Sequence, residues 1–305
     1  MEEKPNYTED AVSIAIATNL AVLSFPFSRF SVVPISRKKE RWLGADARLL
    51  SSSKFLPFYM QFKRPFAHTT PSRAKIIKDR ESLEPSLSTS PRTLFFDLQD
   101  KQPKHRDYQH NVLFRLHQRL RSRGIGDAAY VCPLFLDRQT YFYTSHMSGI
   151  KSWLRNWPAH PFKSNLVQIN SKSCAPISET IPVLAEHISI PPHKLVTDAK
   201  HKYSFTESGS EVCFHSSPEP LTEGEYSFSS WLENIILGSD LQENSLYFDD
   251  SSDFLKELVS EVLGNKNNFF KPSEFESGEQ AWFAWGHFLK EQYGIEQYGI
   301  LIRKP

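Results

Sequence analysis

The alternation of apolar and polar residues predicts a helix followed by strands in the first part of the chain. Thr8 can cap a helix whose first turn holds two carboxylates and which continues to about residue 24. Strands are expected to follow this helix, at Phe30–Ile35, Gly44–Leu50 and Phe55–Arg64. The polar segment 51–54 separates the last two strands and is typical of a turn.

Helical periodicity returns at Tyr108–Arg123, where the apolar residues fall on one stripe and Gly124 follows the last turn. Ala128–Phe135 then has the composition of a buried strand. The segment 68–106 is rich in proline and serine, which predicts a long loop or mobile insertion with a short strand at Thr93–Asp97. The order of elements is therefore helix, three strands, helix, strand.

The second half of the chain has a weaker pattern after about residue 161. Two amphipathic helices are predicted at Asp253–Leu263 and Glu279–Tyr293, the latter preceded by Ser277 as a helix cap. A final strand is expected at Ile295–Ile302. We therefore expect an α/β fold with a mixed central sheet in residues 1–155 and an α+β accessory region in residues 156–305.

The segment Phe55–Arg64 is the most informative one for chemistry. Side chains alternate across a strand, so Tyr59, Gln61 and Lys63 share one face and should line a cleft or solvent. The apolar side chains share the opposite face and should pack in the core: Leu56, Phe58, Met60 and Phe62. A strand that is only structural does not need a lysine at such a position.

Pairing this strand with Gly44–Leu50 as a hairpin would place Asp46 opposite Tyr59. Asp46 would then lie diagonally from Gln61, at about 7–8 Å, on the same face as Lys63. This expectation depends on the register, because a shift of one residue would turn Asp46 to the other face of the sheet.

A carboxylate, an amide and an ammonium group in this arrangement fit phosphodiester hydrolysis. Oxygen ligands such as those of Asp46 and Gln61 suit Mg²⁺ or Mn²⁺, which neutralises phosphate charge and lowers the pKa of a bound water. Lys63 can orient that water or stabilise the charge that develops in the transition state.

Asp46 followed by Gln61-Phe62-Lys63 resembles the bipartite motif of the PD-(D/E)XK, or restriction-endonuclease-like, nuclease superfamily. The order of helices and strands is similar to the αβββαβ core of that superfamily. The resemblance implies a metal-dependent nuclease in which Asp46 and Gln61 hold the metal and Lys63 is the catalytic lysine. Glu9, or Asp10 beside it, matches the additional acid that some members carry on the first helix. The wider chain also resembles uncharacterised bacterial proteins.

The charge of the chain is unevenly distributed, although the formal net charge is only +1. Residues 1–155 contain 25 Lys+Arg and 14 Asp+Glu, a charge of +11, whereas residues 156–305 contain 11 and 21, a charge of −10. This asymmetry favours a basic half that meets a polyanion. Nucleic-acid contacts are predicted for a set of residues at and near the second helix: Lys104, Gln109, Arg115, Arg119 and Arg123.

Other classes of protein are disfavoured by the sequence. Three cysteines without metal spacing argue against a disulfide framework or a zinc finger, and the first residues do not have the pattern of a signal peptide. The sequence contains no GxxxxGK[ST], GxGxxG, HExxH or GxSxG motif. No apolar run is long enough to span a bilayer, so a cytosolic protein is expected.

Three functions therefore remain open. The first is a Mg²⁺- or Mn²⁺-dependent endonuclease, with DNA favoured as substrate and, by analogy with the superfamily, a role in antiviral defence. The second is a catalytically inactive nucleic-acid-binding or assembly subunit on the same fold, since Gln61 carries no negative charge. The third is a scaffold in which the two oppositely charged halves pair. A protein partner or a second copy of the chain is expected at the acidic half.

Overall fold

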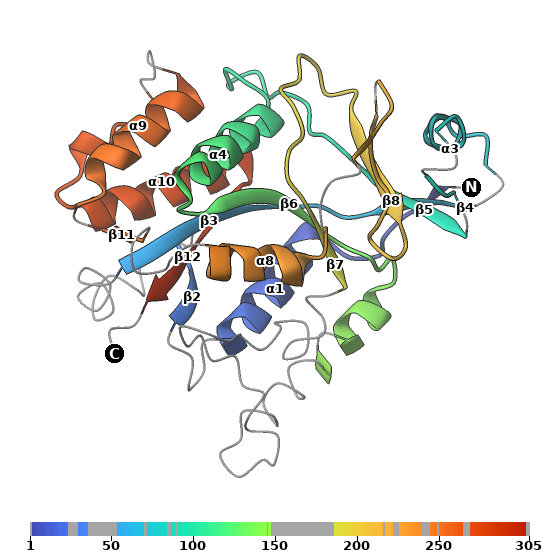
Figure 1. Ribbon diagram of the computed structural model, residues 1–305, viewed down its shortest axis with the longest axis horizontal. Helices are drawn as coiled ribbons and strands as arrows, with labels where there is room; N and C mark the ends of the chain where they lie inside the picture. Colours follow the sequence, from blue (N-terminus) through green and yellow to red (C-terminus); the bar gives the residue numbers. More distant parts are fainter. Residues whose placement is uncertain are drawn as a thin grey trace, which may run out of the picture.

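The computed structural model describes residues 2–23, 30–35, 54–69, 72–83, 87–89, 91–144, 146–147, 186–215, 217–221, 226–238, 245–248, 250–264 and 269–302. Within these ranges the chain forms an α/β fold with two sheets (Figure 1). None of the helices in these ranges has the length and apolar character needed to cross a bilayer.

One of the two sheets is mixed, with parallel and antiparallel pairs. Its strands lie in the order β2 (Phe30–Pro34), β12 (Glu296–Ile302), β3 (Lys54–Phe62), β6 (Asp127–Pro133) and β7 (His187–Ile190), with β11 (Leu246–Tyr247) beside the start of β3. β3 and β6 are parallel, and every other pair in this sheet is antiparallel. The parallel pair requires a crossover connection, which includes helix α4 (Gln109–Arg123).

Helices cover both faces of this sheet (Figure 1). α4, α9 (Ser252–Leu263) and α10 (Gly278–Tyr293) lie on one face, and α1 (Glu9–Leu23) and α8 (Phe228–Gly238) lie on the other. The alternation of β3 explains this arrangement, because Phe55 and Tyr59 belong to the core cluster under the first set of helices. The neighbouring Leu56, Phe58 and Met60 belong to the cluster under α1 and α8.

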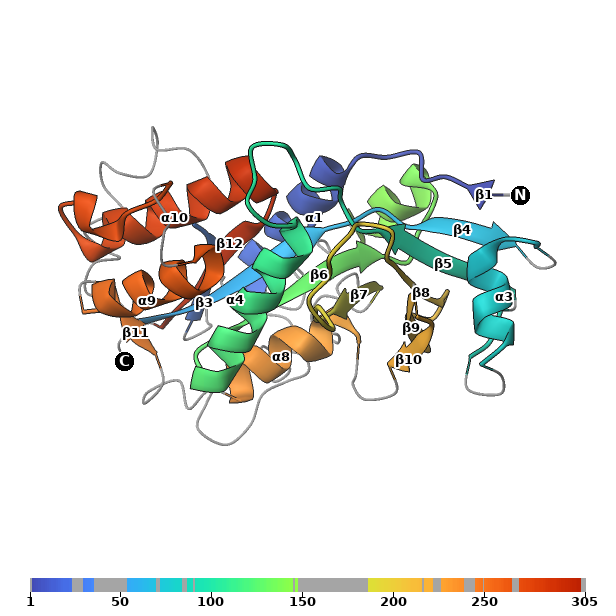
Figure 2. The ribbon, with the colours of Figure 1, turned by 90° about the horizontal axis from the view of Figure 1, so that it is seen from above.

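The second sheet extends from the first (Figure 2). It consists of β1 (Glu2–Glu3), β4 (Phe66–Thr69), β5 (Arg92–Asp97), β8 (Lys202–Thr206), β9 (Val212–His215) and β10 (Glu219–Leu221), in that order. The short helix α3 (Lys75–Glu81) packs against it, and the single-turn helix η2 (Pro272–Glu274) precedes α10.

Most of the predicted elements are confirmed. The helices expected from residues 8, 108, 253 and 279 correspond to α1, α4, α9 and α10, and Ser277 caps α10 by accepting from the amide of Gln280. The strands predicted at residues 30, 55, 93, 128 and 295 correspond to β2, β3, β5, β6 and β12.

The predicted insertion at 68–106 needs correction. This segment contains the end of β4, the helix α3 and the strand β5, which is central in the second sheet. The described residues of this segment therefore form short elements rather than one long loop.

The predicted division at residue 155 is also wrong. β12 and β7 come from the second half of the chain, yet both lie in the sheet that holds β3 and β6. In the other sheet, β8 pairs with β5 in the same way. The described residues of 156–305 therefore complete both sheets and do not form a separate accessory region.

The predicted hairpin is wrong as well, because both edges of β3 at Tyr59 are occupied by other strands. Tyr59 lies opposite Gln297 of β12 on one side and opposite Ala128 of β6 on the other. The pairing that would have brought Asp46 to Tyr59 is thus excluded, and Asp46 itself lies outside the described residues.

Candidate functional site

The candidate site is a cavity of about 360 Å³ at the carboxyl end of β3. Because β3 and β6 are parallel, their carboxyl ends lie at the same edge of the sheet, where ligand sites of α/β proteins commonly form. The starts of α1 and α4 and the end of α10 contribute to its walls. Polar side chains dominate this lining: Glu9, Asp10, Gln61, Gln109, Lys290 and Glu296.

Gln61 is the member of the predicted site that reaches this cavity from β3. Its side chain is only 4% exposed, and its amide nitrogen donates to the carbonyl of Phe62 at 3.2 Å. Its amide oxygen is buried and has no hydrogen-bond partner within the described part of the chain. Leaving a buried carbonyl oxygen unpaired is costly, so this atom is available to a ligand in the cavity.

Lys63 follows Gln61 on the same face and is almost fully buried, at 6% exposure. Its ammonium nitrogen lies 3.5 Å from the amide oxygen of Gln109 and 5.8 Å from the ring centre of Tyr130. Among the described residues, no carboxylate lies within 4.0 Å of this nitrogen. Burial lowers the pKa of Lys63 below its usual 10.5, and the more distant carboxylate of Glu9 opposes the shift.

The prediction for the polar face of β3 is therefore correct only for Gln61. Tyr59 is fully buried, and Lys63 lies behind Gln109 instead of lining the cavity itself. Helices cover both faces of the sheet (Figure 1), and the face that was predicted to be polar is buried at Tyr59, Gln61 and Lys63.

Gln109 links Lys63 to the end of α10. While its oxygen faces Lys63, its amide nitrogen donates to the carbonyl of Tyr293. The next residue, Gly294, has the left-handed conformation with φ of +62° and ends α10. A Cβ atom at Gly294 would lie 3.5 Å from the amide nitrogen of Gln109 and 3.8 Å from the side-chain amide of Gln61, so this turn packs closely on both glutamines.

Carboxylates from α1 and from β12 line the cavity. Glu9 and Asp10 lie exposed in the first turn of α1, where negative charge favours the positive end of the helix dipole. Glu296 begins β12 and is 5% exposed; it accepts from Ser13 at 2.8 Å and from Lys290 at 3.0 Å. The sequence analysis did not identify Glu296, although a charged residue at the start of an apolar strand is a usable signal.

No group of three or more His, Cys, Asp or Glu residues able to hold a metal occurs in the part of the chain that the structure describes. The residues that could contribute to a cation site here are Gln61 through its unpaired oxygen and Glu9 or Asp10 through their carboxylates. These donors are all oxygen atoms, the chemistry that suits Mg²⁺ or Mn²⁺.

The arginines predicted to contact nucleic acid lie mainly against the acidic helix α9. Arg119 forms ion pairs with Glu257 at 2.5 Å and with Glu261 at 3.1 Å. Arg123 pairs with Glu257 at 3.6 Å. Part of the charge asymmetry is thus neutralised inside the molecule, which reduces the attraction that these arginines can offer to phosphate.

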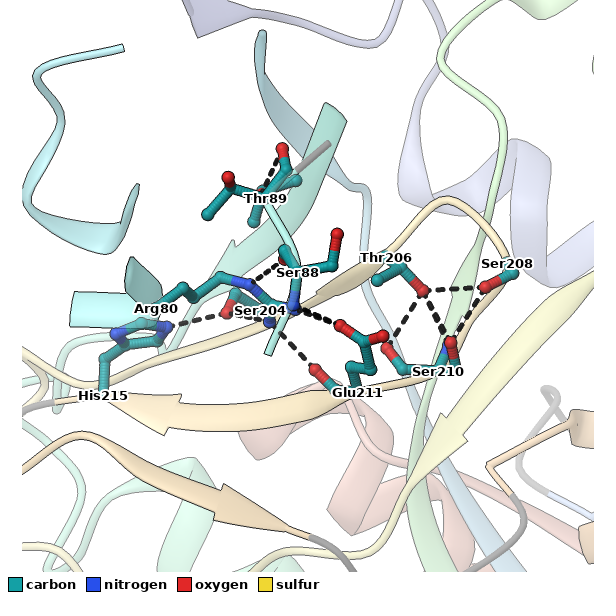
Figure 3. Close-up of polar contacts among 10 residues, drawn as sticks. Arg80, Ser88, Thr89, Ser204, Thr206, Ser208, Ser210, Glu211 and His215 are labelled. Carbon is teal, nitrogen blue, oxygen red and sulfur yellow. Dashed lines mark hydrogen bonds and ion pairs between the residues drawn. The ribbon is translucent and has the colours of Figure 1, made fainter. Parts of the chain in front are cut away.

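A second polar cluster lies in the other sheet, around the buried side chain of Arg80 (Figure 3). Arg80 donates to the carbonyl of Ser88 at 2.8 Å, to the hydroxyl of Ser204 at 3.0 Å and to the carbonyl of Glu211 at 2.9 Å. Ser204 also lies 2.7 Å from His215, whose other ring nitrogen is 3.1 Å from Asp79. Ser204 has no exposed surface, so this serine, histidine and aspartate hold α3 to the sheet and cannot meet a substrate.

Comparison of the chain with protein-family models, with curated proteins and with solved structures found no match.

Proposed function

We propose that the protein is a metal-dependent nuclease that acts at the cavity beyond β3. The observation that carries this proposal is the juxtaposition of Gln61 and Lys63: an unpaired buried oxygen and a buried ammonium without a nearby carboxylate among the described residues. Both groups are costly to bury, and a divalent cation and a phosphate group would satisfy them together.

The proposed cation would be held by Gln61 and by Glu9 or Asp10, which line the cavity. When bound, it would neutralise phosphate charge and lower the pKa of a water. Lys63 does not line the cavity, so it would act once the side chain of Gln109, which it contacts, turns aside. Because burial lowers its pKa, its amine can exchange a proton with a water more readily than an exposed lysine can, and its charged form can stabilise an anionic phosphate.

The restriction-endonuclease-like core is also part of this proposal. In the sheet that contains β3 and in its helices, the elements follow the order α1, β2, β3, α4 and β6, with β3 and β6 parallel, which supports it. β4, α3 and β5 come between β3 and α4 and belong to the other sheet. The insertion of β12 between β2 and β3 is a difference, since it brings the end of the chain into the middle of the sheet. We propose DNA as the favoured substrate and, by analogy alone, a role in antiviral defence.

The test is cleavage of nucleic acid by Lys63→Met, a substitution that keeps most of the buried volume. With plasmid DNA, single-stranded DNA and RNA as substrates and Mg²⁺ or Mn²⁺ added, the variant should lose at least about 100-fold in rate. Lys200→Met is the matched control, because Asp198-x-Lys200 has the same local pattern but Lys200 is exposed. Wild-type cleavage by a folded Lys63→Met protein would overturn the proposal.

A catalytically inactive nucleic-acid-binding subunit is the second candidate, favoured by the neutral side chain of Gln61. Calorimetry with Mn²⁺ separates the two functions. An inactive subunit should bind nucleic acid but no Mn²⁺, and Gln61→Glu should then gain Mn²⁺ affinity because it restores a charged ligand. Mn²⁺ binding by the wild-type protein that is lost in Gln61→Leu would favour the nuclease.

A further inference from the structure

A second cavity of about 370 Å³ adjoins the candidate site. It lies between α4, α9 and α10, on the face of the sheet where Figure 2 shows these helices side by side. Gln292 and Tyr293, at the end of α10, line both cavities. The two cavities therefore flank the same turn of helix.

The second cavity has an aromatic mouth. Phe269 is 59% exposed, which is unusual for a phenylalanine, and the guanidinium of Arg106 lies 5.2 Å from its ring centre. Deeper in the cavity, the rings of Phe288 and Tyr293 meet edge to face at 6.3 Å. Flat apolar surfaces of this kind are the ones on which nucleobases stack.

The mouth is also basic. Lys104 and Arg106 are exposed at the rim, and Lys104 forms no ion pair with any residue that the structure describes. Arg115, by contrast, is held by Asp107 at 2.5 Å and by the carbonyl of Val262 at 3.1 Å, so it helps to shape the wall. Glu261 adds a negative charge at the far side, and Arg119 pairs with it. The available positive charge is thus at the Lys104 side of the mouth.

We propose that this second cavity binds one unstacked base of a single-stranded nucleic acid, with the adjoining phosphate at Lys104. The base would stack at the mouth, on the exposed ring of Phe269. Duplex would bind less well, because the faces of its paired bases are covered by their neighbours. That the same strand continues into the cavity beyond β3 rests on the proposed nuclease function; the binding of the base does not.

The experiment measures binding without cleavage, by fluorescence anisotropy of a fluorescein-labelled oligothymidylate in EDTA, alone and annealed to its complement. Phe269→Ala should weaken binding of the single strand about tenfold and that of the duplex by less than about twofold. Lys104→Ala should reduce the slope of log Kd against log salt by about 0.7 for the single strand. Unlabelled thymidine monophosphate, added as a competitor, should displace the strand only weakly because it lacks neighbouring phosphates.

The matched control is Phe142→Ala. Phe142 is also partly exposed and lies under a guanidinium, with Arg138 at 5.3 Å, but it does not line the cavity. Wild-type affinity of Phe269→Ala, or an equal loss of single strand and duplex, would overturn the proposal. The proposal would also be overturned if Phe142→Ala lost as much affinity for the single strand as Phe269→Ala. The same holds if thymidine monophosphate, at the concentration of the strand, displaced the labelled strand completely.

The outcome is independent of catalysis. If Phe269→Ala has a lower affinity for the single strand while the wild-type protein cleaves no nucleic acid, the base site is supported and the nuclease function is refuted. If Lys63→Met loses cleavage while Phe269→Ala binds normally, the nuclease function stands and the base site fails.

Discussion

The ammonium nitrogen of Lys63 lies 3.5 Å from the amide oxygen of Gln109, a residue 46 positions further along the chain. Gln109 is neutral and also donates to the carbonyl of Tyr293, so a buried cation is held by an amide that is itself fixed by the end of α10. An isolated charge in the interior is destabilising, and buried groups with perturbed pKa values cluster at functional sites.

This relationship predicts how stability depends on alkaline pH. Burial lowers the pKa of Lys63 in the folded protein, so between that lowered value and 10.5 the unfolded chain binds more protons at this residue. The free energy of unfolding of the wild-type protein should therefore rise, relative to that of Lys63→Met, as the pH increases toward 10.5. Urea unfolding of both proteins across this range measures the difference. For the control Lys200→Met, the difference from wild type in the free energy of unfolding should not rise with pH. A difference between wild type and Lys63→Met that does not change with pH would contradict the prediction.

His110 predicts a dependence on acidic pH. It is buried in α4 between the hydroxyl of Tyr130 at 2.9 Å and the carbonyl of Lys194 at 2.7 Å. Burial lowers its pKa from 6.5 to about 4, and the hydrogen bond to Lys194 opposes this shift. The unfolded chain therefore takes up the proton first as the pH falls, and this residue alone should remove about 3 kcal/mol of stability between pH 6.5 and 4.

The measurement compares wild type with His110→Gln by chemical unfolding at a series of pH values. His110→Gln is expected to be less stable than the wild type at neutral pH, because it loses well-formed hydrogen bonds. The difference in free energy of unfolding between the two proteins should become smaller toward pH 4. The exposed His146 offers a control, and His146→Gln should run parallel to the wild type. A difference that does not change with pH would show that His110 has the same pKa in the folded and the unfolded protein, which would contradict the prediction.

Arg80 predicts a large structural effect away from the candidate site. Its side chain is fully buried and donates to two carbonyls and a hydroxyl, which Arg80→Met would leave unpaired. We expect a loss of about 2–4 kcal/mol in the free energy of unfolding. The exposed Arg73 lies just before the same helix, and Arg73→Met should change stability by less than about 0.5 kcal/mol. A loss below about 1 kcal/mol for Arg80→Met would mean that water replaces the missing donors.

Arg119 tests whether the opposite charges of the two halves stabilise the fold. It is largely covered and pairs with Glu257 and Glu261 of α9. A double-mutant cycle of Arg119→Ala with Glu257→Ala should give a coupling of about 0.5–1 kcal/mol that decreases at high salt. Arg119→Ala should also leave the affinity for nucleic acid nearly unchanged. A loss of affinity with no coupling energy would instead place Arg119 at the nucleic-acid surface, as the sequence pattern predicts.

The elements of the fold were largely predictable because their signals are local. The stripe of Val112, Leu113, Leu116 and Leu120 identifies α4, and all four side chains are buried in the structure. The alternation of β3 likewise places Leu56, Phe58 and Met60 together in one core cluster, as predicted. The opposite face, predicted to be polar, contributes Tyr59 to a second core cluster. Ser277, predicted as a cap from its position, accepts the expected hydrogen bond.

The hairpin and the domain boundary failed for a common physical reason. An extended strand offers hydrogen bonds on two edges, and any strand of the chain can occupy them, whatever its distance in sequence. Here β12, from the last residues described, occupies one edge of β3 and β6 the other. Sequence neighbours pair often enough to make the hairpin a reasonable prediction, but nothing in its own residues excludes β12.

Contacts between distant segments also explain which features of the site could be read from the sequence and which required the folded structure. The motif Gln61-Phe62-Lys63 and the first-turn carboxylate Glu9 were identifiable from residue type and spacing, because side-chain direction along a strand or helix follows from the local backbone. That Lys63 is buried against Gln109, that Gln61 faces a cavity with Glu296, and that the arginines of α4 meet α9 depend on contacts between distant segments. Burial and electrostatics are properties of those contacts, so they arise only when the whole chain is packed.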